Sequence, residues 1–297
     1  MEFHQLAAVV AVADHGSFTG AAEALGHSQP SISLAVRRLE REVGIALFER
    51  LSTGVVPTTA GEALLGPARQ ALRDRDIGLE AVADVSGLAA GHLDIACIPT
   101  LAADIATPIL GAFRRCHDHV SIRLREPEVG SSVEDLVRRG QSELGFCALP
   151  ADGTGLAQLL IEDQELVAVL SAGHAAAYER KGAIPIERLA DLPLITAPEG
   201  ASTHTQLAAA LDAIGVMLVP GIVTDHRDTI VPLVLAGAGA AVLPRAVAET
   251  THSPDVTVLP LHPAMTRSVG LVHRQTVLSP AARTIIELAS QGRDAWL

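Results

Sequence analysis

The sequence has few cysteines, because its 297 residues include only Cys97, Cys116 and Cys147. An odd number without a CxxC spacing argues against a disulfide framework and fits a reducing compartment. The first residues also lack a basic segment and a spanning apolar run, since Glu2 and His4 come early and Gly16 breaks the stretch. Neither a secretory signal nor a membrane partner is therefore expected, and we expect a cytoplasmic protein.

Basic residues are also scarce. The chain has 22 lysines and arginines against 34 acidic residues, which gives a formal net charge of −12. Residues 1–60 contain four arginines, no lysine and six acidic residues. Because phosphate neutralisation needs clustered cations, this balance argues against nucleic-acid binding through total charge. A DNA-binding surface must instead depend on where the few arginines are placed.

Apolar residues make up 48% of the chain and charged residues 19%, so burial can offset chain entropy and a globular protein is expected. The length is too great for one ordinary core and suits two or three domains. From residue 91 onward, short apolar runs alternate with helical patterns. That alternation is typical of parallel sheets with crossover helices, and it predicts an α/β protein that follows an all-α N-terminal region.

The N-terminal residues predict three short helices separated by glycines. An apolar stripe from Phe3 onward stops at Gly16, and Ser17 is a suitable N-cap for a second helix that ends at Gly26. Residue 28, a serine, can cap a third helix with a proline in its first turn, where N–H groups lack intrahelical acceptors. Two short helices joined by a tight glycine turn predict a helix-turn-helix.

A wing is predicted directly after the third helix. The segment IALFERLSTGVVPTT, residues 45–59, reads as two short strands joined by a turn at Ser52, Thr53 and Gly54, with Arg50 just before it. Together with the preceding helices, this segment predicts an N-terminal winged helix-turn-helix.

The third helix presents two chemically different faces. Ile32, Val36, Leu39 and Val43 fall in one stripe, which should pack on the first two helices. The opposite face centres on Leu34 among arginines, and such a face can enter a major groove and contact bases and phosphates. An ordinary amphipathic surface helix is the alternative. The residues predicted to bind DNA are Ser28, Gln29, Pro30, Ser31, Ser33, Leu34, Arg37, Arg38, Arg41 and Arg50.

A long helix is predicted after the wing. Thr59 and Glu62 form a capping-box pattern at its start, and the helix should run to about Leu88, although Pro67 and Gly78 interrupt it. A long, half-apolar helix between two domains needs a partner, and a second copy of itself is the simplest one. Its apolar residues recur at about 3.5-residue spacing, at Leu65, Ala68, Leu72, Leu79 and Val82.

Residues 91–297 predict a ligand site at the ends of strands. Open α/β sheets bind ligands outside the carboxyl ends of their strands, where helix N-termini present free N–H groups. Here those positions are Thr100, after ACIP, and Ser202 with Thr203, after ITAPEGA. Such a site favours a small polar molecule, often a carboxylate; the alternative is that these hydroxyls only cap helices. The remaining walls are assigned to Leu101, Phe146, Cys147, Thr224 and Asp225.

The segment FHQLAAVVAVADHGSFTGAAEALGHSQPSISLAVRRLEREVGIALFER, followed by PTTAGEALL, closely resembles the winged helix-turn-helix of LysR-type transcriptional regulators. A weaker resemblance covers the rest, at GHLDIACIPTLAADIATPILGAF, LADLPLI and LAGAGAAVLP. The resemblance implies a regulator that binds double-stranded DNA and a small effector. It implies effector contact at Thr100, Ser202 and Thr203, a dimer through the linker helix, and commonly a dimer of dimers.

The resemblance also implies a domain order. Residues 1–58 are expected to form the winged helix-turn-helix, and residues 59–89 the linker helix for dimerisation. The effector-binding domain, residues 90–297, should have the two-lobed fold of periplasmic binding proteins. We assign lobe I to residues 90–161 and 268–297, and lobe II to residues 162–267, with crossovers near residues 161 and 268.

The sequence departs from the family pattern at four positions. Leu34 and Ala35 stand where many relatives have polar or basic residues, so base readout should differ from theirs. His27 occupies a turn position that is more often apolar, and Asp118 stands where a proline is common. None of these residues breaks the expected fold.

Other motifs in the sequence predict little chemistry. CHDHV, residues 116–120, offers possible zinc ligands but falls at a helix-to-strand connection, so no metal is expected. GAGAAV lacks the third glycine of a dinucleotide fingerprint, and no nucleophile or acid-base constellation stands out, so no cofactor and no enzyme activity are predicted. Neither Cys97 nor Cys147 has a basic neighbour in sequence, which disfavours a redox sensor. A solute-binding module without DNA is the main rival to a regulator.

Overall fold

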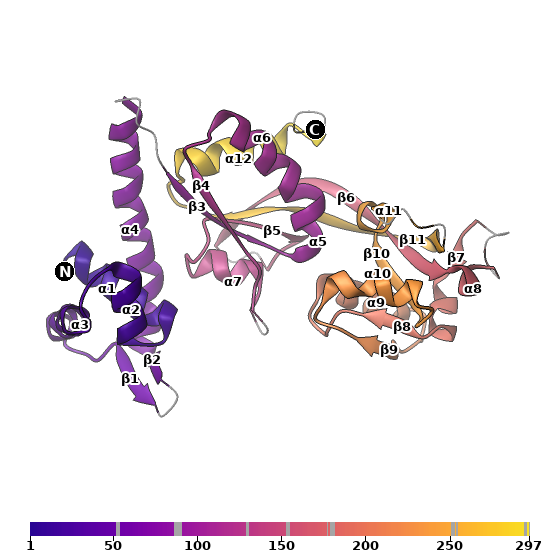
Figure 1. Cartoon of the computed structure of the whole chain (residues 1–297), viewed down its shortest axis with the longest axis horizontal. Helices are drawn as coiled ribbons and strands as arrows, with labels where there is room; N and C mark the ends of the chain where they lie inside the picture. Colours follow the sequence, from indigo (N-terminus) through magenta and orange to yellow (C-terminus); the bar gives the residue numbers. More distant parts are fainter. Residues whose placement is uncertain are drawn as a thin grey trace.

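The structure is a computed structural model, and it describes residues 1–51, 54–85, 91–128, 131–152, 155–176, 178, 182–250, 253, 255–293 and 296. Three parts follow one another along the chain: a small N-terminal domain, a long helix, and an elongated two-lobed α/β body (Figure 1). This order confirms the predicted fold class. Ser52 and Thr53, assigned to the turn of the wing, and Leu88, assigned to the end of the linker helix, lie outside the described residues.

The N-terminal domain consists of α1 (Phe3–His15), α2 (Phe18–Leu25), α3 (Gln29–Val43) and the hairpin of β1 (Phe48–Leu51) with β2 (Gly54–Pro57). Each helix ends at a glycine in the left-handed region, with φ of 60° at Gly16, 66° at Gly26 and 77° at Gly44. A side chain with a Cβ is strained in that conformation, which explains why glycine stands at all three stops. The Ser17 hydroxyl accepts a hydrogen bond from the Gly20 amide at 3.0 Å, as predicted for an N-cap.

Two local expectations for this domain are wrong. Val43 does not join the buried stripe of Ile32, Val36 and Leu39, because it is 44% exposed at the last turn of α3. The Ser28 hydroxyl makes no cap hydrogen bond among the described residues, and instead lies 2.8 Å from the Ser31 hydroxyl. Ala35, which departs from the family pattern, is buried in the domain core.

Helix α4 (Thr59–Val85) connects the N-terminal domain to the α/β body. Its predicted N-cap is displaced by one residue: Thr58, not Thr59, accepts the Gly61 amide on its hydroxyl at 3.1 Å. The first half of α4 completes the N-terminal core, whereas Leu79 further along is 63% exposed. Pro67 stands inside the helix without ending it. In the described part of the chain, no helix is both long and apolar enough to cross a membrane.

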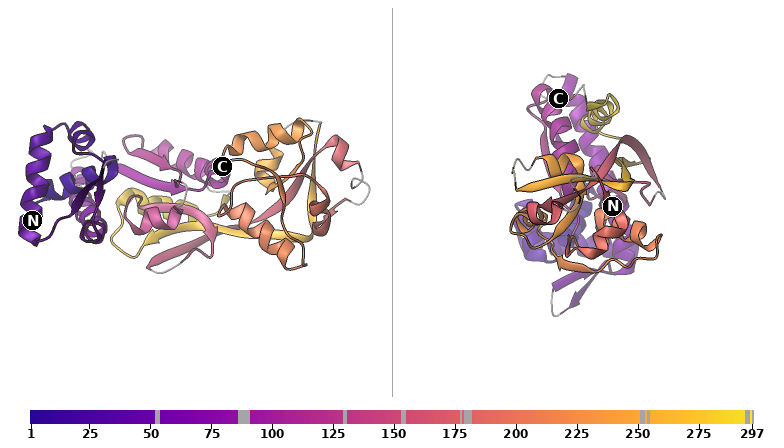
Figure 2. Two further views of the ribbon diagram at one scale, coloured as in Figure 1. Left: turned by 90° about the horizontal axis from the view of Figure 1, so that it is seen from below. Right: turned by 90° about the vertical axis from the view of Figure 1, so that its right-hand side faces the viewer.

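The α/β body is built on one sheet with strand order β4-β3-β5-β11-β6-β10-β8-β9, and β7 pairs with β11 outside this order. β6 and β11 are long antiparallel strands that run through both lobes, past positions 161 and 268 (Figures 1 and 2). The strands are β3 (His92–Cys97), β4 (Ser121–Arg125), β5 (Leu144–Leu149), β6 (Leu156–Ser171), β7 (Ile184–Pro185), β8 (Leu194–Thr196), β9 (Pro220–Val223), β10 (Ala240–Pro244) and β11 (Val256–Arg274).

Helices cover both faces of this sheet. In lobe I, α6 and α12 lie on one face and α7 lies on the other (Figure 1). The helices are α5 (Pro99–Leu101), η1 (Ala102–Ala106), α6 (Thr107–Cys116), α7 (Val133–Arg138), α8 (Ala172–Ala175), η3 (Ile186–Asp191), α9 (Ser202–Asp212), η4 (Arg227–Thr229), α10 (Ile230–Leu235), α11 (Arg245–Glu249) and α12 (Pro280–Ser290).

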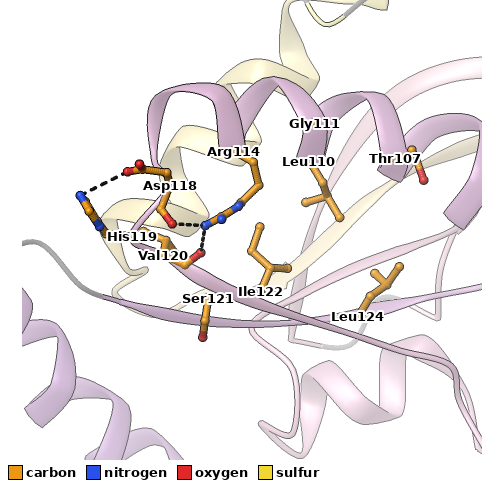
Figure 3. Close-up of a pocket in the computed structure, with 10 residues that line it drawn as sticks. All are labelled: Thr107, Leu110, Gly111, Arg114, Asp118, His119, Val120, Ser121, Ile122 and Leu124. Carbon is orange, nitrogen blue, oxygen red and sulfur yellow. Dashed lines mark hydrogen bonds and ion pairs between the residues drawn. The ribbon is translucent and has the colours of Figure 1, made fainter.

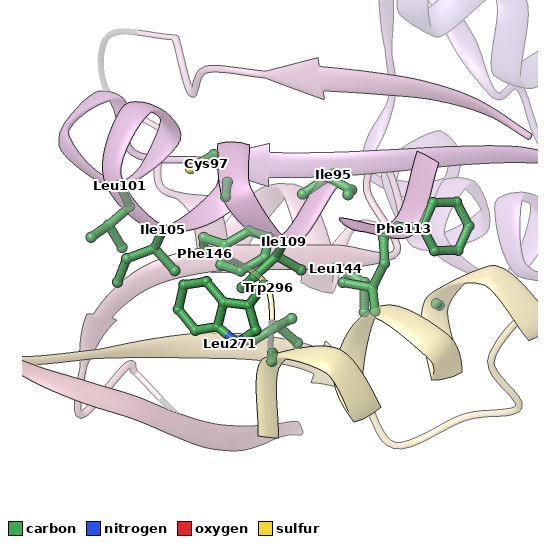
Figure 4. Close-up of a cluster of buried hydrophobic side chains, with 14 of the residues drawn as sticks. Ile95, Cys97, Leu101, Ile105, Ile109, Phe113, Leu144, Phe146, Leu271 and Trp296 are labelled. Atoms are coloured by element: carbon green, nitrogen blue, oxygen red, sulfur yellow. The ribbon is translucent and has the colours of Figure 1, made fainter. Parts of the chain in front are cut away.

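Each lobe has its own apolar core. The main core of lobe I lies between the sheet and the pair α6 and α12, where Phe113, Phe146 and Trp296 are almost fully buried (Figure 4). A smaller cluster under α7 contains Val133, Val137 and Cys147. Lobe II has a separate core, which includes Leu166, Leu170 and Leu207.

Candidate DNA-binding face and interlobe cleft

The outer face of α3 is exposed and cationic. All of the residues predicted to bind DNA are exposed except Ser33, which is half-buried. Leu34 is 46% exposed, and it lines a shallow hollow with Arg37, Arg41 and Ile45. The Arg41 Nε donates to the Arg37 carbonyl at 3.3 Å, which holds the Arg41 side chain along the helix.

The arginines of α3 are available to an outside anion. Among the described residues, no carboxylate lies within salt-bridge distance of Arg37, Arg38 or Arg41. Arg50 lies at the end of the wing, with its guanidinium carbon 5.6 Å from the centre of the Phe18 ring. An exposed, unpaired guanidinium can bind a phosphate or a base edge at little desolvation cost. Leu34, Arg37 and Arg41 thus line one exposed hollow on α3, and Arg50 is exposed on the wing.

A groove of about 580 Å³ separates the two lobes, and we term it the interlobe cleft. From lobe I it is lined by the end of β3, the loop after β4, the start of α7 and the end of β5. From lobe II it is lined by the loop before α9 and by residues that follow β9. Three predicted effector residues line it, and they are Cys147, Ser202 and Asp225.

The other predicted effector residues lie behind or beside the cleft. Leu101 and Phe146 are fully buried in the lobe I core and do not line it. Thr100 and Thr203 are each 9% exposed, at the first turns of α5 and α9. The Thr224 hydroxyl accepts the His226 amide at 3.1 Å and so closes the local turn. The prediction from strand ends thus identified the end of the sheet at which the cleft lies, but it did not separate residues of the cleft wall from residues of the core.

Arg267 occupies the junction between the lobes. Its Nη2 donates to the Thr100 hydroxyl of lobe I at 2.9 Å, and its Nη1 donates to the Ser202 hydroxyl of lobe II at 3.1 Å. Its Nε and Nη2 also donate to Gln164 Oε1 at 3.1 and 2.8 Å. The Arg267 side chain therefore ties both lobes to the crossover strands. Sequence reasoning missed it, and the only available signal was a charged residue inside the apolar strand AMTRSVGLV.

The Arg267 guanidinium is a buried cation with no direct counter-ion among the described residues. The residue is 2% exposed, and burial lowers its pKa to about 10. The charge of Asp104 raises this pKa from a distance, but within the described ranges no carboxylate oxygen lies within 4.0 Å of the guanidinium. Neutral hydroxyl and amide oxygens satisfy its hydrogen bonds but do not balance its charge.

The outer rim of the cleft is acidic. Arg227 lines the same cleft; burial lowers its pKa, while Glu126 and Asp225 act in the opposite direction. An acidic rim disfavours the approach of a highly charged anion. The rim carboxylates are Glu126, Glu128, Glu134, Asp135, Glu199 and Asp225.

The two buried thiols near the cleft are held in the protonated form. Burial raises the pKa of Cys97 to about 12, and Glu126 adds to this effect. Burial also raises the pKa of Cys147, with a further contribution from Glu134. Since the thiolate is the reactive form, neither side chain is suited to redox sensing.

The motif CHDHV lies at the end of α6 and beside a surface pocket (Figure 3). Arg114 Nη1 donates to the carbonyls of Asp118 at 2.5 Å and Val120 at 2.6 Å, so the arginine caps the connection into β4. The Asp118 and His119 side chains are 74% and 79% exposed, and Asp118 Oδ1 lies 3.3 Å from His119 Nε2. In the part of the chain that the structure describes, no group of three or more His, Cys, Asp or Glu residues is arranged to hold a metal ion.

Comparison with known proteins places both regions in one family. Residues 3–62 match the model of the bacterial regulatory helix-turn-helix protein, lysR family, and residues 86–293 match the LysR substrate binding domain. A probable hydrogen peroxide-inducible genes activator of Mycobacterium leprae is 31% identical over 264 residues, which cover 89% of this chain and 79% of that protein.

Two solved structures share the full-length fold. A full-length OxyR variant from Pseudomonas aeruginosa has a TM-score of 0.79 at 22% identity, covering 100% of this chain and 96% of that one. Full-length CbnR in complex with its target DNA has a TM-score of 0.65 at 22% identity, covering 97% of this chain and 98% of that one.

Proposed function

The chain belongs to the LysR family of DNA-binding transcriptional regulators with an effector-binding domain, and we propose which of its surfaces bind DNA and effector. The exposed face of α3 binds double-stranded DNA. The interlobe cleft binds a small monocarboxylate, which changes how the protein binds or bends its promoter. Family membership makes the chain a regulator and not an enzyme, and the proposal needs no cofactor besides the effector.

The observation that carries the DNA assignment is the unpaired arginine face of α3. Arg37 and Arg38 are exposed near Leu34, as phosphate and base contacts in a major groove require. The test is fluorescence anisotropy of the full-length protein with the DNA upstream of its own gene, against a scrambled duplex of equal length. Preferential binding that survives physiological salt is expected. Equal binding to both duplexes at every salt concentration would reject these assignments.

The effector assignment depends on the environment of Arg267. This buried cation donates a hydrogen bond to one hydroxyl from each lobe, and it contacts no carboxylate in the described structure. A carboxylate can replace neutral acceptors around such a guanidinium with charge-assisted hydrogen bonds. Ser202 both contacts Arg267 and lines the cleft, so an anion that enters the cleft meets this network directly. The same anion would draw the two lobes together, because Thr100 and Ser202 come from opposite lobes.

The acidic rim limits the kind of anion. Glu126 and Glu199 face the same cleft as Asp225, and repulsion from these carboxylates opposes a dicarboxylate or a phosphorylated ligand. We therefore favour a ligand with one carboxylate, which points inward to Arg267, and a neutral or cationic remainder.

Thermal unfolding in the presence of ligand panels tests this class. Acetate, pyruvate and benzoate represent monocarboxylates, succinate represents dicarboxylates, and chloride at equal ionic strength is the control. A ligand that binds only the folded state raises Tm with concentration. We expect at least one monocarboxylate to raise Tm in the wild type but not in Arg267→Met. A larger shift with succinate, or an equal shift in Arg267→Met, would contradict the assignment.

We also propose that the protein dimerises through α4 and that dimers pair into tetramers. Leu79 is 63% exposed on the far half of α4, and burial of such side chains between two copies would be favourable. Light scattering after gel filtration tests the dimer. We expect Leu79→Asp to shift the protein toward monomer, while Leu160→Asp, at a 56% exposed leucine on β6, leaves the mass unchanged. A dimer unaffected by Leu79→Asp would place the interface elsewhere.

A further inference from the structure

Helix α7 begins at the interlobe cleft. The Ser132 hydroxyl accepts the Asp135 amide at 3.1 Å, and the Asp135 carboxylate accepts the Ser132 amide at 3.3 Å, which forms a capping box. Both residues line the cleft together with Glu134. The first turn of α7 is therefore part of the cleft wall, and any occupant of the cleft lies against it.

The other end of α7 is held by α4. Arg73 Nη1 donates to the Gly140 carbonyl at 2.7 Å, and Arg69 Nη1 donates to the Arg139 carbonyl at 3.1 Å. Arg139 is the C-cap residue of α7 and Gly140 follows it, so these charge-assisted hydrogen bonds satisfy the carbonyls of the turn directly after the helix. Gly140 has φ of 70°, and a Cβ there would lie 2.6 Å from Arg73 Nη2. The left-handed backbone favours glycine at this position, and a Cβ there would require the Arg73 guanidinium to shift.

Arg69 continues the contact into the DNA-binding domain. Its Nη2 lies 2.5 Å from the Asp14 carboxylate, near the end of α1. Arg69 is only 8% exposed, whereas most surface arginines are well solvated. α1 shares one core with α3, through Val9, Val12 and Val36 among others. One guanidinium therefore contacts both the effector-binding domain and the domain that carries the DNA-binding face.

The contact between α7 and α4 brings two guanidinium groups close together. Arg73 and Arg274 both approach Gly140, since its Cβ position lies 2.6 Å from Arg73 Nη2 and 3.1 Å from Arg274 Nη1. Burial lowers the pKa of Arg274 to about 10, and the nearby charge of Arg73 lowers it further. Among the described residues, Arg73 Nε and Nη2 and Arg274 Nε are buried without a hydrogen-bond acceptor. Like-charge repulsion and these unsatisfied donors oppose the hydrogen bonds, while the charge of Glu143 favours both guanidinium groups. The contact is therefore a balance of opposing terms that a displacement of α7 would change.

We propose that α7 transmits cleft occupancy to the DNA-binding domain, through the hydrogen bonds from Arg69 and Arg73 to the carbonyls at its C-terminal end. This inference rests on the proposed function, because it assigns the regulation of the same cleft. Occupancy that orders the first turn of α7 fixes the Arg139 and Gly140 carbonyls and strengthens their bonds to α4. An empty cleft leaves α7 free to fray, which loosens α4 and the attached α1.

Hydrogen–deuterium exchange of the full-length protein tests the route without DNA or effector. Ser132→Ala removes the α7 cap at the cleft, and Arg73→Met removes the bond at the opposite end. Loss of an N-cap serine should speed exchange of α7 amides about fivefold. We expect Ser132→Ala also to speed exchange in α4 around Arg69 and Arg73, and we expect this second effect to disappear in the Arg73→Met background.

Arg114→Met is the matched control background. Arg114 caps the end of α6 on the other face of the sheet with the same kind of arginine-to-carbonyl bond. In that background the α4 response to Ser132→Ala should persist in full. The proposal is overturned if Ser132→Ala speeds exchange in α7 alone, or if its effect on α4 is the same with and without Arg73. A failed carboxylate screen would reject the proposed ligand class but would leave this exchange result standing.

Discussion

The DNA-binding face of α3 and the interlobe cleft both depend on arginine, but they place it in opposite environments. Arg37, Arg38 and Arg41 are exposed and separate, whereas Arg267 is 2% exposed and fixed by four hydrogen bonds. Exposed cations act through additive, salt-screened attraction, while a buried cation acts through a few defined contacts. The first arrangement suits a long polyanion, and the second suits one small anion of particular shape.

The largest expected effect of burial is on the reactivity of the thiols, because one cysteine is exposed and two are buried. Cys116 is exposed, and burial raises the pKa of Cys97 from 9.0 to about 12. A rise of three units makes thiolate about a thousandfold scarcer at pH 8. Iodoacetamide should therefore label Cys116 rapidly and leave Cys97 and Cys147 intact, as mass spectrometry of the native protein would show. In urea all three should react, and rapid native labelling of Cys97 would break the contrast.

The raised pKa also fixes the sign of a pH effect on stability. In the folded state the Cys97 thiol keeps its proton, whereas in the unfolded chain it ionises near its ordinary pKa of 9.0. Its contribution to the free energy of unfolding is therefore fully present below about pH 9 and is lost as pH rises toward about 12. Denaturant titrations of the wild type and Cys97→Ala should therefore show the wild type losing stability relative to the variant as pH rises across that range.

Substitution of Arg267 should have the next largest effect. Arg267→Met removes the cation while keeping most of the side-chain volume. The affinity for the carboxylate found by thermal screening should fall on the order of a hundredfold, because the anion loses a buried charge partner. Ser202→Ala, which removes one hydroxyl and keeps the guanidinium, should weaken binding about tenfold. Calorimetric titration provides both values, and equal affinity in Arg267→Met would show that the buried arginine is only structural.

Substitution of a single arginine on α3 should have a smaller effect on DNA affinity, and that effect should depend on salt. Arg37→Ala should weaken DNA binding about tenfold at low salt and reduce the slope of log K against log salt by about 0.9, if Arg37 contacts a phosphate. Arg188→Ala, at an exposed arginine paired with Asp191 in lobe II, is the control and should leave the slope unchanged. A loss of discrimination at one base pair with an unchanged slope would mean that Arg37 contacts a base.

Substitution of Leu34 should have the smallest effect on DNA affinity. It is 46% exposed at the centre of the α3 face and has no charge, so it can contribute only apolar contact. Leu34→Ala should weaken binding a few-fold, chiefly where a thymine methyl faces it. Replacing single thymines by uracil in the operator should reproduce that loss at one position in the wild type and have no further effect in Leu34→Ala. Additive losses would show that Leu34 contacts no methyl group.

Local features could be predicted from the sequence because local residues determine them. The glycine stops of α1 and α2 and the stripe of Ile32, Val36 and Leu39 follow from backbone freedom and helical period. Val43 was misplaced, because a small angular error on a helical wheel exchanges buried and exposed positions at the edge of a stripe. The cap at Thr58 differs from the predicted Thr59 by one residue, within the usual imprecision of helix ends.

Features that depend on distant parts of the chain were not predicted. Arg267 meets Thr100, which is 167 residues away in sequence, and no periodicity encodes that meeting. Phe146 was assigned to the cleft because it ends a strand, but alternate residues of that strand point to opposite faces, and Phe146 lies on the core side. The hydrogen bonds from Arg69 and Arg73 to the carbonyls after α7 could likewise not be predicted, because they depend on how two domains pack.

Occupancy of the buried arginine site should alter DNA binding by the exposed arginine face. The decisive measurement is a quantitative DNase I footprint on the upstream DNA, with and without the carboxylate found by thermal screening. We expect the carboxylate to shift the protein concentration for half-protection, or to change the pattern of protected and bend-enhanced positions, in the wild type but not in Arg267→Met. Identical footprints with and without a carboxylate that demonstrably occupies the cleft would contradict this expectation.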